Sequence, residues 1–222
     1  MKRWALLVAG LYALMLAALT VPVFLLAFLP QSGESEILHA YAEWAYWAFI
    51  GVMLLSQFAL LAVPVRVASR RPVTRGALWP TLLAGGMMAA ALVAGACYSL
   101  LEFFFRDQVF PAWIGWTAFG TVLFTWLVWS VAFYRVSRRG EPGDLISRQC
   151  RLLFRGSVLE LLIAVPTHIV ARYRDYCCAG WMTFIGLTTG IAVMLFSFGP
   201  AVFFLFAERW RRLHPAPEAQ GV

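Results

Sequence analysis

The chain has 222 residues, of which 62% are hydrophobic and only 13% are charged, and it carries a net charge of +7. A soluble domain has about 45–50% apolar and about 25% charged residues, so this composition excludes a water-soluble globule. The basic residues lie in short segments between apolar runs and form no single soluble face, which argues against a nucleic-acid partner. The sequence therefore predicts an all-α integral membrane protein whose main partner is the lipid bilayer.

Six apolar stretches are long enough to cross a hydrocarbon core about 30 Å thick, which takes about 20 residues. We predict a single transmembrane domain over residues 1–222, a polytopic bundle of about six helices, with spans near 4–29, 39–65, 78–105, 111–134, 152–171 and 181–206. The first run, Trp4–Leu29, has 26 residues. A signal peptide has an apolar core of only about 7–15 residues, so we expect this run to be a retained helix.

The orientation of the bundle follows from its basic residues. Fifteen of the eighteen lysines and arginines fall on one side of the six spans, and only Arg106, Arg172 and Arg174 fall on the other. Because short cytoplasmic segments are rich in lysine and arginine, the sequence predicts that both termini are cytoplasmic. We expect an integral protein of the plasma membrane, which is the inner membrane in a bacterium.

Small residues recur at intervals of four in two of the predicted spans. They are Ala91, Gly95 and Ser99 in the third span, and Gly186 and Gly190 in the sixth. Such spacing is typical of helix faces that pack closely in lipid. We therefore predict that these two faces are helix contacts.

The segment 144–154 runs into the predicted fifth span and is amphipathic. It combines leucine and isoleucine residues with Arg148 and Arg151. Helices of this kind lie at the membrane surface, so we expect this piece at the cytoplasmic interface.

The fifth span holds the most unusual residues of the chain. Glu160 follows the start of the span by eight residues, Pro166 interrupts the helix, and His168 comes soon after. A charged group at this depth costs about 2.5–3.5 kcal/mol, so each such residue is a functional hypothesis. Glu160 is predicted either to carry a proton or bind a cation, or to be a neutral carboxylic acid that bonds a neighbouring helix.

The predicted topology brings several metal-binding residue types to the outer face of the membrane. The expected ligands are His168, Cys177, Cys178 and Cys97, and the metals that such ligands accept are copper, zinc and iron. His168 and Arg172 are four residues apart and share a helix face. Cys97 and Glu102 are five residues apart, about 140° around a helix, so they do not point at one centre. No spacing in the chain matches a common metal motif.

The adjacent pair Cys177 and Cys178 is the most specific feature. Neighbouring Cα atoms are about 3.8 Å apart, below the usual disulfide range of about 4.4–6.8 Å, so a bond between the two would be easily reduced. We predict that the pair takes part in redox chemistry or binds metal, with Glu160 as an internal proton group. Arg172 would stabilise a thiolate or hold an anionic group. The alternatives are that one of the two forms a disulfide with Cys97 or with another chain, or that both cysteines are small residues filling a loop.

The function that these residues favour is an outward-facing site of cysteine, histidine and glutamate that handles a transition metal or performs thiol redox chemistry. A second hypothesis is a non-catalytic accessory or assembly subunit of a larger membrane complex, with other membrane subunits as partners. A third is a small proton-coupled transporter of a solute or lipid, with Glu160 as its proton site.

Overall fold

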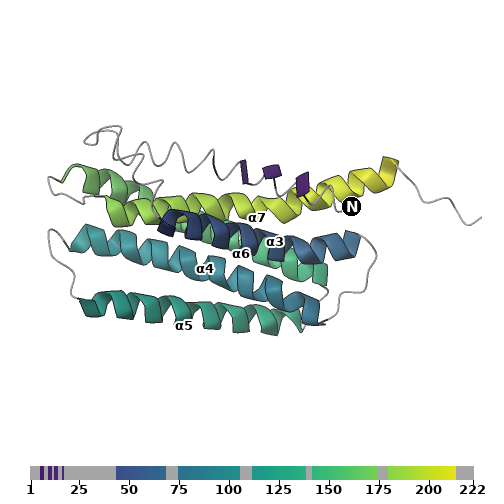
Figure 1. Cartoon of the computed structure of the whole chain (residues 1–222), viewed down its shortest axis with the longest axis horizontal. Helices are drawn as coiled ribbons and strands as arrows, with labels where there is room; N and C mark the ends of the chain where they lie inside the picture. Colours follow the sequence, from purple (N-terminus) through teal and green to yellow (C-terminus); the bar gives the residue numbers. More distant parts are fainter. Residues whose placement is uncertain are drawn as a thin grey trace, which may run out of the picture.

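The described part of the chain is helical throughout. A computed structural model describes residues 44–68, 75–105, 112–138, 142–174 and 180–213, together with a few positions between 6 and 17. The five ranges hold α3 (Trp44–Ala68), α4 (Arg75–Phe104), α5 (Ala112–Ser137), α6 (Pro142–Arg172) and α7 (Trp181–Leu213), and no strand. The helices run side by side, with α4 between α5 and the pair α6 and α7 (Figure 1). The all-α fold class is confirmed for these residues.

Four of these helices are long and apolar enough to cross a membrane. The candidate spans are Leu78–Phe104, Phe119–Ser137, Leu145–Arg172 and Met182–Gly199, and each overlaps a predicted span. Helix α3 contributes a shorter apolar stretch, Ile50–Leu61. The predicted span at 4–29 lies outside the described residues except at a few positions. The total of six spans and the cytoplasmic location of both termini therefore stay predictions.

Helix α6 begins ten residues before the predicted fifth span, because the amphipathic segment 144–154 is its first part. Leu145 and Ile146 are buried in a cluster with Leu78 and Leu82 of α4 and with Phe133 of α5. The apolar side of this segment therefore packs on neighbouring helices and the segment is continuous with the rest of α6, while its place at the cytoplasmic interface stays a prediction.

The main apolar core joins α3, α4, α6 and α7. Its buried residues are Met53, Leu60, Ala84, Met88, Ala89, Leu92, Leu153, Ala192, Val193 and Phe196. In contrast, α5 exposes large apolar side chains, among them Trp116, Phe119, Phe124 and Leu127. Contiguous exposed apolar surface of this kind is expected where lipid is the solvent. Helix α5 therefore lies at the edge of the bundle and packs mainly on α4.

The backbones of α4 and α7 meet at Gly95 and Gly186. A Cβ atom added to Gly95 would lie 3.1 Å from the Cα atom of Gly186, and one added to Gly186 would lie 2.8 Å from the carbonyl oxygen of Gly95. Any side chain at either position would therefore push the helices apart. The predicted packing role of the small-residue faces is confirmed at this crossing.

We expect Gly186→Ala to destabilise the bundle by about 1–3 kcal/mol, because overpacking forces the crossing apart. The melting temperature of the purified protein in detergent, followed by tryptophan fluorescence, measures this effect. Gly120→Ala on α5 is the matched control, since no atom lies within 4 Å of a Cβ atom at that position. Equal melting temperatures for the two variants would contradict a close crossing.

Candidate functional site

Glu160 of α6 projects into the crossing between α4 and α7. Its side chain is only 2% exposed. A Cβ atom on either Gly95 or Gly186 would lie 3.0 Å from the Oε1 atom of Glu160, and one on Gly190 would overlap Oε2. The carboxyl group therefore occupies the space that three glycines leave open. This position depends on all three helices, because α6 supplies the acid and α4 and α7 supply the glycines.

The carboxyl group of Glu160 has hydrogen-bonding capacity that no described residue uses. Neither of its oxygens has a hydrogen-bond partner among the described residues. The hydroxyl group of Ser99 is in the same situation, and Ser99 is 0% exposed. Both groups lie against Gly186, since a Cβ atom there would contact Ser99 Oγ as well as Glu160 Oε1. An unpaired buried polar group lowers the stability of the fold by about 1–3 kcal/mol. Such groups in a folded protein call for an explanation, and a functional role is one.

Glu102, near the end of α4, holds the first turn of α7. Its Oε1 atom accepts a hydrogen bond from the backbone N–H of Gly180 at 2.5 Å, and its Oε2 atom accepts one from the N–H of Thr183 at 2.8 Å. The first N–H groups of a helix have no partner within the helix and carry partial positive charge, so a carboxylate there is stabilising. Glu102 therefore acts as a cap for α7 that is supplied by another helix.

Arg174 contacts Glu102 as well, through the backbone carbonyl group of Glu102 and not through its side chain. Its Nη1 atom donates to the carbonyl oxygen of Glu102 at 2.7 Å, and its Nη2 atom donates to that of Phe103 at 2.9 Å. These carbonyl groups belong to the last turn of α4, where backbone acceptors are left over and a cation is favourable. Glu102 is thus held by the segment after α6 through its backbone and holds α7 through its side chain.

His168 of α6 is bound to the start of α7. The hydroxyl group of Thr183 donates its single hydrogen to the carbonyl oxygen of Gly180 at 3.0 Å. The Nδ1 atom of His168, 2.9 Å from the Thr183 oxygen, is therefore the donor in that bond. In the neutral ring this leaves the lone pair on Nε2, the nitrogen that is open to a proton or a metal ion.

Gly180 lies at the centre of this second group of residues. Its φ angle is +90°, in the region that favours glycine. An added Cβ atom would lie 2.9 Å from Cδ of Arg172 and 3.3 Å from Cε1 of His168. Arg172 and His168 therefore pack together against this turn, as expected for two residues four apart on one helix face.

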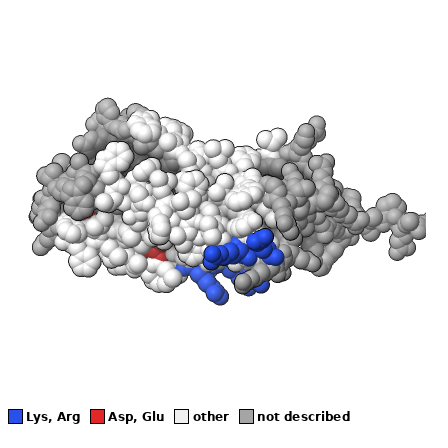
Figure 2. Space-filling view, turned by 90° about the horizontal axis from the view of Figure 1, so that it is seen from below, with Lys and Arg blue, Asp and Glu red and all other residues white. Residues whose placement is uncertain are grey.

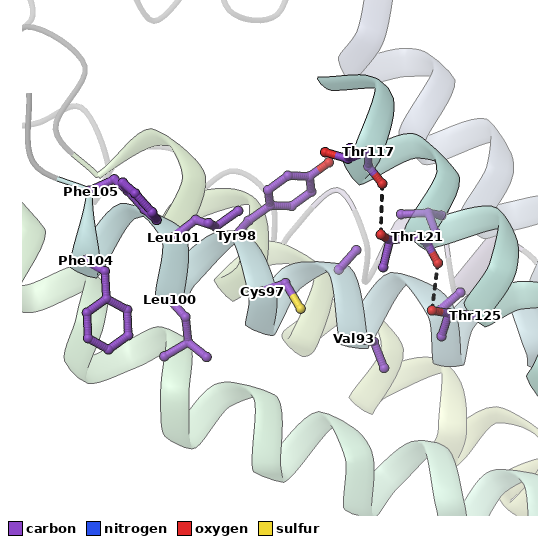
Figure 3. A pocket seen from close by; sticks show the side chains of 13 residues that line it. Val93, Cys97, Tyr98, Leu100, Leu101, Phe104, Phe105, Thr117, Thr121 and Thr125 are labelled. Atoms are coloured by element: carbon purple, nitrogen blue, oxygen red, sulfur yellow. Dashed lines mark hydrogen bonds between the residues drawn. The ribbon is translucent and has the colours of Figure 1, made fainter. Parts of the chain in front are cut away.

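The other predicted site residues lie elsewhere. Cys97 is exposed and lines a pocket of about 450 Å³ between α4 and α5 (Figure 3). Cys177 and Cys178 lie outside the described residues, in the segment between Arg174 and Gly180. Within the described ranges, no group of three or more histidine, cysteine and acidic residues could hold a metal ion.

The pocket beside Cys97 is apolar. Its lining includes Val93, Leu100, Leu101, Phe104, Phe105 and Val122. Thr121 and Thr125 also face it, but their hydroxyl groups donate to the carbonyl oxygens of Thr117 and Thr121 on their own helix, at 2.8 and 2.7 Å (Figure 3). The pocket therefore suits an apolar or weakly polar molecule.

Comparison of the chain with protein-family models, with curated proteins and with solved structures found no match.

We expect Glu102→Ala to destabilise the protein by about 1.5–3 kcal/mol, because two backbone N–H groups of α7 lose a charged acceptor. Amide hydrogen exchange should report faster exchange at Gly180 and Thr183, and the melting temperature should fall by about 3–12 °C. Phe104→Leu is the control, since Phe104 is exposed and faces the pocket from the same turn. Unchanged protection of the first turn of α7 would show that Glu102 does not cap it in solution.

Proposed function

We propose that this chain is a small proton-coupled membrane transporter in which Glu160 binds and releases the proton. The observation that carries the proposal is the Glu160 carboxyl group, which is buried among helices long and apolar enough to span a membrane, without a hydrogen-bond partner among the described residues. Ionisable residues at such positions are rare and typical of proton relays in transporters and pumps.

The glycine surroundings link the charge of Glu160 to the packing of three helices. An ionised carboxylate that is buried and unpaired is strongly unfavourable, so the packed crossing suits the neutral acid. Loss of the proton leaves a charge that must reach water or a cation. That requirement favours separation of α4 and α7 around Gly95, Gly186 and Gly190. Protonation would then shift the bundle between a closed and an open arrangement.

The polar groups around Glu160 support proton exchange with one end of the bundle. Toward the end of α4 that holds Glu102, the interface of α4, α6 and α7 contains Ser99, Thr183 and His168. In the opposite direction the same helices meet in the apolar core, where Met88, Leu153, Val193 and Phe196 are buried. A proton leaving Glu160 therefore meets hydroxyl, imidazole and carboxylate groups toward the Glu102 end, whereas the buried polar groups toward the other end, among them Ser157 and Gln149, are hydroxyl and amide groups.

The apolar pocket between α4 and α5 supports a lipid-like cargo. It shares α4 with the Glu160 crossing: Gly95 and Ser99 face α7, whereas Cys97 and Tyr98 line the pocket. A movement of α4 that relieves the charge on Glu160 would change the shape of the pocket as well. This shared helix is the coupling element of the proposal.

We expect Glu160→Gln to abolish the pH dependence of transport, because glutamine has the shape of the protonated acid but cannot ionise. Infrared difference spectra of the wild-type protein during a pH titration should contain a carboxylic-acid band that the variant lacks. In proteoliposomes, exchange of a fluorescent lipid analogue should respond to pH in the wild type only.

Ser157→Ala is the matched control for this experiment, since Ser157 is buried on the same helix and donates to the carbonyl oxygen of Leu153 at 2.6 Å. It should retain the titration and the pH response. A wild-type titration that is identical in Glu160→Gln would overturn the proton role of Glu160.

A second candidate function is the handling of a transition metal or thiol redox chemistry at the Glu102 end of α4. It is favoured by His168, whose Nδ1 atom is fixed by Thr183 so that Nε2 is open. A histidine oriented through its second nitrogen is the usual arrangement of a metal ligand. Cys177 and Cys178 belong to the segment between Arg174 and Gly180, two residues that each bond Glu102. These thiols and His168 are the ligands we propose.

For this candidate, we expect purified wild-type protein to contain stoichiometric copper, zinc or iron by elemental analysis. The metal should be lost from Cys177→Ser/Cys178→Ser and from His168→Ala, because each removes a ligand. Cys97, the fourth ligand predicted from the sequence, is the comparison, since its thiol faces the α5 pocket. Metal-free wild-type protein whose thiols also resist oxidation and reduction would dismiss this candidate.

A further inference from the structure

Arginine side chains gather on one face at the far end of the bundle from Glu102. The patch consists of exposed residues at the end of α5 and in the first half of α6: Arg135, Arg138, Arg148, Arg151 and Arg155. Figure 2 shows the basic side chains as one cluster on this face. Both acidic residues whose side chains the structure describes, Glu102 and Glu160, are buried. The exposed charge of the described residues on this face is therefore positive.

The patch is continuous across two helices that touch. Arg148, Arg151 and Arg155 are spaced by three and four residues, so they share one face of α6 over about 10 Å. Gln149 and Leu153, between them in sequence, are buried in the bundle. Phe133 of α5 packs against Leu145 and Ile146 of α6 in one cluster, which brings Arg135 and Arg138 to the same end.

Aromatic residues lie beside Arg138 at the end of α5. The rings of Trp79 and Tyr134 stack with centroids 5.4 Å apart, and the guanidinium carbon of Arg138 lies 5.6 Å from the centroid of the Tyr134 ring. Both aromatic side chains are partly exposed at this end of α4 and α5. Tryptophan and tyrosine collect at the membrane–water boundary, which is the level of the lipid phosphates. The stack also orders Arg138 through its cation–π contact.

We propose that the arginine patch is a binding site for an anionic phospholipid, with guanidinium groups holding the phosphate. Arginine matches phosphate geometry because its planar fork donates two parallel hydrogen bonds. The acyl chains of the lipid would contact the part of α6 that follows the patch, where Val158, Leu159 and Leu162 are exposed. A free phosphate ion would leave this apolar stripe unused. The combination of charge and adjoining apolar surface therefore favours a lipid.

Native mass spectrometry of the full-length protein in detergent, with equal amounts of phosphatidylglycerol and phosphatidylcholine, tests this site. We expect the wild type to bind phosphatidylglycerol preferentially. Arg148→Gln/Arg151→Gln/Arg155→Gln should lose about tenfold to a hundredfold in affinity for it, since each arginine near an anionic surface contributes on the order of fivefold. Glycerol 3-phosphate, which carries the phosphate without acyl chains, should not compete at equal concentration.

A second triple variant, Arg209→Gln/Arg211→Gln/Arg212→Gln, removes the same charge from the end of the chain and should keep the preference. An equal loss in both triple variants would show a general effect of net charge and overturn the site. Effective competition by glycerol 3-phosphate would identify a phosphate site without a lipid and would also overturn the proposal. If the first triple variant does not fold, Arg148→Gln and Arg155→Gln are tested singly, and unchanged affinity in both would be decisive against it.

Discussion

The crossing of α4 and α7 is the constraint on which the rest of the bundle depends. Gly95 and Gly186 let the two backbones touch, and α6 lies against both helices with Glu160 directed at the contact. In lipid there is no hydrophobic force between helices, so close backbone packing is one of the few sources of association. The same contact that holds the helices together also encloses the Glu160 carboxyl group, which is buried without a hydrogen-bond partner among the described residues. The stability of the helix bundle and the environment of Glu160 therefore both depend on the crossing of α4 and α7.

Glu102 and Arg174 fix the ends of the helices that meet at this crossing. The carboxylate of Glu102 satisfies donors at the start of α7, while Arg174 satisfies acceptors at the end of α4. Backbone groups in a membrane need internal partners, because lipid offers none. Two charged residues at this end of the bundle thus have a structural reason to be there. His168 and Arg172 are held beside them by the turn at Gly180, which gives this end of the bundle a defined arrangement for chemistry.

Much of the fold could be predicted from the sequence, whereas the site could be predicted only in part. Apolar runs of about 20 residues located four spans, since a helix is the structure that satisfies its own backbone in lipid. Glu160 could be identified as a candidate site residue from the sequence, because a carboxyl group inside an apolar span has a high free-energy cost. The glycine neighbours of Glu160 could not be identified, because periodicity reveals a packing face but not its partner. Cys97 shares a predicted depth with His168, yet the structure directs it toward α5, since depth does not fix the direction around a helix. The cap formed by Glu102 uses backbone donors, which no side-chain pattern indicates.

The attachment of α5 has a mechanical consequence. Trp126 donates to the carbonyl oxygen of Leu83 at 2.9 Å, and a Cβ atom on Gly86 would contact Ser130, so α4 and α5 are in tight contact there. Farther along, beside Cys97 and Thr117, the same two helices are separated by the pocket. The contact near Trp126 is therefore the point at which α5 is attached to α4. A small rotation of α5 about this contact would displace the helix most at the pocket, so the width of the pocket depends directly on the angle between α4 and α5.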